Sequence, residues 1–191
     1  MTRRRWAAGL ALATGIALTP ATVQAQDAKQ QAKCDEAVQL FRSADRDMAK
    51  FFETAVGYAI FPSVGKGAFI VGGAAGTGCL YDGGAIIGQA KLVQVTVGFQ
   101  LGGQAYAEII FFQTHDALAS FKSSSFEMSA QVSAVAAASG ASANAKYELG
   151  VLVFTIAKGG LMYEASVGGQ KFTFKPMPES SSGEAAAPKK D

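Results

Sequence analysis

Histidine, cysteine and tryptophan are scarce in this 191-residue chain, which has one, two and one of them. With a single histidine and two widely separated cysteines, the sequence has no ligand spacing of the kind that binds zinc. A serine–histidine–aspartate set would have to use His115, and no G-x-S-x-G nucleophile motif accompanies it. The sequence therefore predicts a protein that is not an enzyme and holds no metal or cofactor.

Carboxylates offer the one remaining route to catalysis. Glu108 and Glu164 each have apolar neighbours, so a raised pKa is conceivable for both. We expect the isolated carboxylates of this region to lie at strand edges or to face outward: Asp82, Glu108, Glu127, Glu148 and Glu164. If the protein were an uncharacterised hydrolase, these carboxylates would be its only candidate catalytic groups.

Long apolar runs are missing after the first 25 residues, and no later run approaches the roughly 20 residues that a spanning helix needs. The start itself has three arginines, Arg3–Arg5, then an apolar run over Trp6–Leu18 and small residues before Ala25. This pattern predicts a secretory signal peptide over residues 1–25 and a mature start at Gln26. The protein is then expected in the periplasm, with association with the outer membrane as one option. The arginines faintly resemble a twin-arginine signal, so the export route is left open.

Neither sign of charge dominates. Removing the three signal arginines from the 17 basic residues leaves 14, against 15 acidic residues, for a net charge of −1. A nucleic-acid-binding protein usually carries a strong basic excess, so nucleic acid is not an expected partner. Any affinity for a membrane has to come from local patches.

Cys34 and Cys79 allow two interpretations in an oxidising compartment. A bridge between them would close a long loop and stabilise the fold by about 3–4 kcal/mol in the chain-entropy model. Alternatively, both are buried free thiols that act as small hydrophobes. The lack of a framework of several cysteines favours the free thiols.

Residues 27–56 have a helical pattern. One apolar stripe has the spacing i, i+3, i+4 and i+7, made by Cys34, Ala37, Val38 and Phe41. Asp45 and Asp47 predict a second helix start. We expect both helices to cover a sheet; the alternative is that the first helix lies on a lipid surface.

Residues 57–175 change to a period of two. Leu92–Gly102 alternates valine, phenylalanine and leucine with glutamine, threonine and glycine, and Phe126–Ala136 alternates similarly. Tyr106–Gln113 is apolar on both faces, as in a central strand. The remaining elements are expected as follows: a strand over Leu149–Ala157, a closing hairpin of Leu161–Val167 and Gln170–Lys175 around Gly168 and Gly169, a helix capped by Thr114 with Leu118 and Phe121 inward, and a loop over Ala137–Lys146. Residues 176–191 are expected to be a disordered tail.

Glycine inside strands costs stability, so its abundance needs a structural reason. Glycine allows a sheet to coil sharply or another backbone to approach closely. The sequence therefore predicts one α+β domain over residues 26–175, with a strongly bent, largely antiparallel, glycine-rich sheet or a small barrel. The N-terminal helices pack on this sheet, and one short helix is inserted between strands.

The stretch FPSVGKGAFIVGGAAGTG over residues 61–78 contains Gly65-Lys66-Gly67. A phosphate-binding loop of the G-x-x-x-x-G-K-[ST] type fails here, because Ile60 replaces its first glycine and Gly67 its hydroxyl residue. Nucleotides are therefore not expected to bind. A second Lys-Gly step at Lys158 also precedes an apolar run, so both lysines are predicted at strand starts, on one rim.

These two cations could meet a phosphate or a lipid headgroup. The apolar neighbours that would accompany them are Phe69, Leu161 and Met162. The alternative is that both lysines are simply solvated beside tight turns.

Three segments together resemble the SYLF domain: FPSVGKGAFIVGGAAGTGCLY, VTVGFQLGGQAYAEIIFFQTHDALASF and KGGLMYEASVGGQKF. The resemblance covers roughly Asp35 to Phe174. It implies lipid binding, since eukaryotic members bind phosphoinositides through an N-terminal amphipathic helix and a basic surface, and some bundle actin. In the helix of this chain only Lys29, Lys33 and Arg42 match that basic character.

The chain lacks the SH3 domain of the eukaryotic members, and a periplasm contains no actin, so actin is not an expected partner. The resemblance implies an exported, non-catalytic protein that binds phospholipid or a membrane surface. The alternative is a structural or interaction protein of the cell envelope, whose sheet pairs with a partner or, as a homo-oligomer, with itself.

Overall fold

The computed structural model describes residues 20–65, 73–95, 105–124, 126–129, 131–158 and 167–177, and the statements below concern these residues. In chain order the elements are α1 (Pro20–Ala44), a 3-10 turn (Arg46–Met48), α2 (Ala49–Thr54), β1 (Gly57–Gly65), β2 (Gly73–Asp82), β3 (Ala85–Val95), β4 (Tyr106–Phe112), α3 (His115–Lys122), β5 (Ala134–Ala136), β6 (Val151–Ala157) and β7 (Gln170–Pro176). The predicted α+β class is confirmed. Most of the predicted signal peptide and tail, residues 96–102 of one predicted strand and the first arm of the closing hairpin lie outside the described residues.

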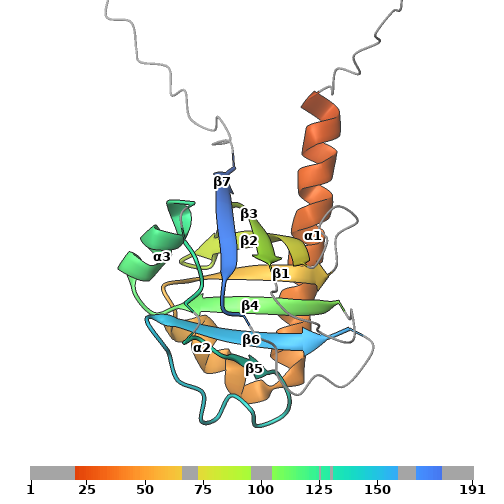
Figure 1. Ribbon diagram of the computed structural model, residues 1–191. Coiled ribbons are helices and arrows are strands. Elements are labelled where there is room, and N and C mark those ends of the chain that lie inside the picture. The colour runs from red at the N-terminus through yellow and green to blue at the C-terminus, as the bar shows by residue number, and fades with distance from the viewer. Residues whose placement is uncertain are drawn as a thin grey trace, which may run out of the picture.

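The seven strands form one sheet in the order β5-β6-β4-β1-β2-β3-β7. Every neighbouring pair is antiparallel except β5 and β6, which are parallel. β5 and β7 are the two edges of the described sheet, which is not closed, so the barrel alternative is wrong for this part of the chain. In Figure 1, β1, β4 and β6 run side by side while β7 crosses their direction, as expected for a strongly bent sheet.

The N-terminal helices cover one face of the sheet, as predicted. The four residues of the α1 stripe are 0–8 % exposed and pack with Tyr58, Ile60, Ile109 and Phe154 of the strands. Because this stripe is covered by the sheet, it does not offer α1 an apolar face for a lipid surface. No helix of the described residues is both long and apolar enough to cross a bilayer.

Asp45 starts the second helical segment, as its sequence position predicts. Its carboxylate accepts hydrogen bonds from the backbone N–H groups of Asp47 (3.0 Å) and Ser142 (2.8 Å). Burial acts to raise the pKa of Asp45, but these bonds outweigh it and hold the pKa below its ordinary value. One charged side chain therefore caps a helix and also anchors the 137–146 loop, which is irregular as predicted.

The opposite face of the sheet is the inside of its bend. α3 and the 126–134 segment close over this inner face, with Leu118, Phe121, Met128 and Val132 buried against the strands. The Thr114 hydroxyl accepts from the Ala117 N–H (3.2 Å), which confirms the predicted cap, and His115 is exposed. The predicted strand Phe126–Ala136 is not continuous. It is two short pieces, one bridged to β7 at Glu127 and one forming β5 beside β6.

Close approach of neighbouring strands explains two of the glycines inside the sheet. A Cβ atom at Gly78 would overlap the carbonyl oxygen of Ile60, and one at Gly88 would overlap that of Lys175. Pro62 lies in a central strand, where a missing N–H normally costs a ladder bond, but it falls within the register shift between Phe61 and Val64. Glycine and proline here permit tight packing and a bulge, as the bent-sheet hypothesis requires.

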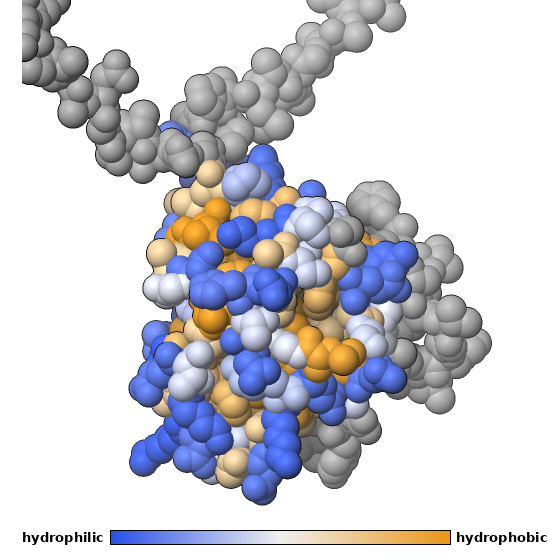
Figure 2. All heavy atoms as spheres, turned by 90° about the vertical axis from the view of Figure 1, so that its left-hand side faces the viewer, coloured by the Kyte–Doolittle hydropathy of each residue, from blue (hydrophilic) through white to orange (hydrophobic). Residues whose placement is uncertain are grey.

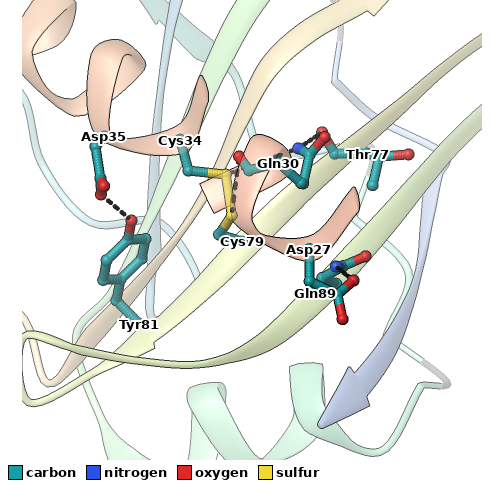
Figure 3. The surroundings of a disulfide bond; sticks show 8 residues. All are labelled: Asp27, Gln30, Cys34, Asp35, Thr77, Cys79, Tyr81 and Gln89. Atoms are coloured by element: carbon teal, nitrogen blue, oxygen red, sulfur yellow. Dashed lines mark hydrogen bonds between the residues drawn. A yellow bond between two sulfur atoms is a disulfide. The ribbon is translucent and has the colours of Figure 1, made fainter. Parts of the chain in front are cut away.

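Cys34 and Cys79 form a disulfide bond that joins α1 to β2, with Cα atoms 6.2 Å apart (Figure 3). The preference for free thiols was therefore wrong. Polar contacts surround the bond: Gln30 Nε2 donates to the Thr77 carbonyl (3.0 Å), and the Tyr81 hydroxyl donates to Asp35 (2.9 Å). The bridge and these bonds fix the position of α1 on the sheet.

Candidate functional site

Five polar side chains meet on the inner face of the sheet, at the end where β1 and β6 finish and β4 and β7 begin. We call them the polar cluster: Gln94, Tyr106, Glu108, Thr155 and Gln170. They come from β3, β4, β6 and β7, and each is at most 8 % exposed. The rest of the inner face is apolar, so the polar cluster stands out as the one place on that face, within the described residues, where several hydrogen-bonding side chains are buried together.

Gln170 is the centre of the polar cluster. Its Nε2 donates to Glu108 Oε2 (2.9 Å) and also lies 3.2 Å from the Tyr106 hydroxyl. The Tyr106 hydroxyl in turn donates to Gln94 Oε1 (3.1 Å). These bonds tie an edge strand, β7, to β4 in the middle of the sheet.

Glu108 has no exposed surface, so the expectation of an outward-facing carboxylate was wrong for this residue. It shares the inner face with Tyr106, Ile110 and Phe112, because alternate residues of a strand point the same way. Burial raises the pKa of Glu108 to about 8, and the hydrogen bond from Gln170 offsets this only in part. Its carboxyl group is therefore mostly protonated at neutral pH. Burial also raises the pKa of Tyr106, with the nearby Glu108 charge as a further cause, so Tyr106 stays neutral.

Within the part of the chain that the structure describes, three atoms of the polar cluster have no hydrogen-bond partner: Glu108 Oε1, Thr155 Oγ1 and Gln170 Oε1. A buried polar atom without a partner costs about 1–3 kcal/mol. A protonated Glu108 reduces this cost, since a neutral carboxyl loses less solvation on burial than a carboxylate does. The polar cluster therefore favours the neutral form of Glu108 over its ionised form.

Lys158 is exposed and follows directly after β6 at this same end of the sheet. Its backbone N–H donates to the Ala105 carbonyl (2.8 Å), and Ala105 also lies against Gly65, the last residue of β1. The last residues of β1 and β6, Gly65 and Ala157, are therefore two strand spacings apart, roughly 10 Å. Lys66 and the two strands that the lysines were predicted to start lie outside the described residues, so the shared rim stays a prediction.

The basic residues of α1 do not form one patch. Lys29 and Lys33 are one helical turn apart and exposed, on a helix whose buried stripe faces the sheet. Arg42 lies half a turn around from Lys33, and its guanidinium carbon is 4.0 Å from the centre of the Phe52 ring. Arg42 is therefore part of the packing between α1 and α2 and is separate from the two lysines.

Phe69, Leu161 and Met162, predicted to accompany the lysines, are outside the described residues, as is Glu164. Sequence reasoning singled out Glu108 but missed its hydrogen-bond partner Gln170 and the neighbouring members of the polar cluster, Gln94 and Thr155. The burial of Gln94 could have been inferred in part, because Gln94 falls on the same side of its strand as the apolar residues Ala90 and Leu92. The alternation of polar and apolar residues in this strand was recognised. However, Val93 is 40 % exposed and Gln94 is buried, so at this point the polar residue lies on the buried side.

Two further observations concern metal binding and the surface of the molecule. Within the described ranges, no group of three histidine, cysteine, aspartate or glutamate residues could hold a metal ion. Figure 2 shows the side of the molecule on which α3 lies, where hydrophilic residues are interspersed with small apolar areas.

Comparison with known families gives one match. Residues 93–177 match the family model Ysc84, described as Las17-binding protein actin regulator. The matched range includes Lys158 and all five residues of the polar cluster, and it does not include α1, β1 or β2. No curated protein matches the chain at a significant level.

Proposed function

Because the chain contains a SYLF domain of the Ysc84 family, we propose that it is an exported, non-catalytic protein that binds phospholipid at a membrane surface. The family model is described as an actin regulator, and the SYLF resemblance implies lipid binding. The family match over residues 93–177 is the observation that carries the proposal. Actin is not proposed as a partner, because an exported protein would not meet it.

The end of the sheet that carries Lys158 is the proposed contact surface. Lys158 is exposed there, and Lys66 follows the neighbouring end of β1. A lysine near an anionic membrane contributes about 1 kcal/mol of attraction. The mature chain is close to neutral, so binding would depend on this local pair, with Lys29 and Lys33 of α1 as a second contact.

Reversing the charge of the rim lysines tests this surface. The double variant Lys66→Glu and Lys158→Glu is expected to bind vesicles containing phosphatidylglycerol at least tenfold more weakly than the wild type, because each change removes one attraction and adds a repulsion. Co-sedimentation at low ionic strength measures the difference. Lys175→Glu is the matched control, since Lys175 is exposed but lies toward the opposite end of β7.

The variant Lys29→Glu and Lys33→Glu measures the contribution of α1 separately. Equal sedimentation of the wild type and the rim variant would exclude the two-lysine surface. If no variant and no wild type sedimented, and the protein formed concentration-dependent oligomers instead, the alternative of a structural envelope module would replace lipid binding.

The contacts of α1 support export with cleavage after Ala25. Residues 24–26 are exposed, and Asp27 accepts a hydrogen bond from Gln89 Nε2 of β3 (2.6 Å). A mature chain that starts at Gln26 would keep this contact and every later one. We expect the intact mass of protein recovered from a periplasmic extract to correspond to residues 26–191, and a mass that includes residues 1–25 would contradict this proposal.

A further inference from the structure

The hydrogen bond between Gln170 and Glu108 spans the inside of the bent sheet. In the strand order, β7 and β4 are separated by β3, β2 and β1, so a flat sheet would place them about 19 Å apart. The two side chains are nevertheless 2.9 Å apart. Phe172 of β7 and Phe61 of β1 also meet across the same interior, with ring centres 5.7 Å apart. The edge strand is thus folded back over the inner face.

Few backbone bonds hold the start of β7 on its outer side. The 126–128 segment supplies them: the Met128 N–H donates to the Gln170 carbonyl (2.8 Å), and the Phe172 N–H donates to the Phe126 carbonyl (3.1 Å). This segment forms only an isolated bridge with β7, at Glu127 and Lys171. An edge held by few bonds opens more easily than the centre of a sheet, so the side-chain contact across the interior has a larger relative effect here.

We propose that Glu108 and Gln170 form a protonation-controlled clasp, which holds β7 over the inner face while Glu108 is neutral and releases it when Glu108 ionises. The geometry gives the reason. Glu108 is fully buried. Among the described residues, Gln170 alone donates a hydrogen bond to its Oε2, and its Oε1 has no partner that could stabilise a negative charge. An ionised Glu108 would be an uncompensated buried charge, and displacement of β7 would let water reach it.

No described cation faces Glu108 to counter its charge. The groups around it are Tyr106 on its own strand, Gln94 on β3, Thr155 on β6 and Gln170 on β7, of which only Tyr106 is titratable. Tyr106 stays neutral because its own pKa is raised, and Glu127 of the adjacent segment is exposed and paired with Lys171. The raised pKa of Glu108, about 8, places the release in the mildly alkaline range.

Amide hydrogen exchange tests the clasp in the intact protein. After correction for the intrinsic rate, the opening of the Met128 and Phe172 amides is expected to increase at least tenfold between pH 6 and pH 9 in the wild type. The Gln113 amide, which donates to the Gly150 carbonyl at the other end of the sheet (2.9 Å), should change much less. Glu108→Gln, a neutral side chain of the same shape, should abolish the increase, whereas Glu127→Gln should retain it.

Two further measurements keep the test decisive if Glu108→Gln folds poorly. Gln170→Ala removes the donor and should leave the Met128 and Phe172 amides weakly protected at both pH values. Carbon-detected NMR of the wild-type Glu108 carboxyl should give an ionisation midpoint that coincides with the loss of protection. Unchanged protection of these amides at pH 9, or an increase that persists in Glu108→Gln, would overturn the proposal. Neither result depends on lipid, so the clasp and the proposed function can fail separately.

Discussion

Replacing Glu108 by glutamine is expected to raise the free energy of unfolding by about 4 kcal/mol at pH 8 and by less than about 1 kcal/mol at pH 5. The pKa of Glu108 is about 8 in the folded protein and near 4.5 in the unfolded chain. The folded state therefore binds more protons between these values, and wild-type stability falls as pH rises from about 4.5 to 8. Glutamine cannot ionise, so the variant avoids this loss. Urea denaturation at several pH values measures the difference.

The test depends on how the difference in free energy of unfolding between Glu108→Gln and the wild type changes with pH. Its value at a single pH is less informative, because the glutamine also alters packing slightly at every pH. Glu127→Gln removes a carboxylate that is exposed and paired with Lys171, and it should follow the wild-type pH dependence. Parallel stability curves for the wild type and Glu108→Gln between pH 5 and pH 8 would show that Glu108 is ionised in the folded protein throughout this range. The buried neutral acid would then be ruled out.

Removal of the Cys34–Cys79 disulfide is expected to lower the free energy of unfolding by about 4 kcal/mol. The bond closes a loop with a sequence separation of 45, and opening that loop gives the unfolded chain more conformational freedom. The native contacts of α1 should persist, since its stripe remains packed and the Gln30 and Asp35 hydrogen bonds do not need the bridge. Urea denaturation of the wild type with and without reductant measures the loss.

The double variant Cys34→Ala and Cys79→Ala is the control for the chemistry of reduction. It should unfold at nearly the same urea concentration as the reduced wild type, and reductant should not affect it further. A loss below about 1 kcal/mol on reduction would mean that the bridge adds little to the packing of α1 on β2.

Local pattern predicted the helices well. The α1 stripe, the Asp45 start and the Thr114 cap each depend on residues within about one or two turns of one another, so periodicity and hydrogen-bonding chemistry suffice to identify them. The central position of β4 was also readable, because only a strand covered on both faces is apolar throughout. These features need no knowledge of distant parts of the chain.

Contacts between distant residues could not be predicted in the same way. Whether Cys34 meets Cys79 depends on where α1 lies across β2, which no local pattern states. Gln94 was assigned by its polarity to the less apolar side of a strand, yet it is buried because Tyr106 and Gln170 satisfy its side chain across the bend. Gln94, Tyr106, Glu108 and Gln170 are linked to one another by side-chain hydrogen bonds that join separate strands. The pattern of its own strand therefore places Gln94 on the wrong side.

The glycine content of the strands predicted that the sheet would be bent. It did not predict whether the bent sheet closes into a barrel. Neighbouring strands approach each other closely at Gly78 and Gly88, and the sequence indicates this by placing glycine, which has no side chain, inside these strands. Whether the bent sheet closes into a barrel depends on pairing between its edges. In the described chain, the 126–136 segment reaches both edges with short pieces that leave the sheet open.

The most direct test of the account is whether the wild-type protein binds an anionic phospholipid surface. Sedimentation with vesicles of phosphatidylcholine alone and with vesicles containing phosphatidylglycerol, each at low and high salt, makes this measurement. We predict binding to the anionic vesicles that weakens as salt increases, and little binding to phosphatidylcholine alone. Protein that remains in the supernatant with both kinds of vesicle at low salt would contradict the proposed function.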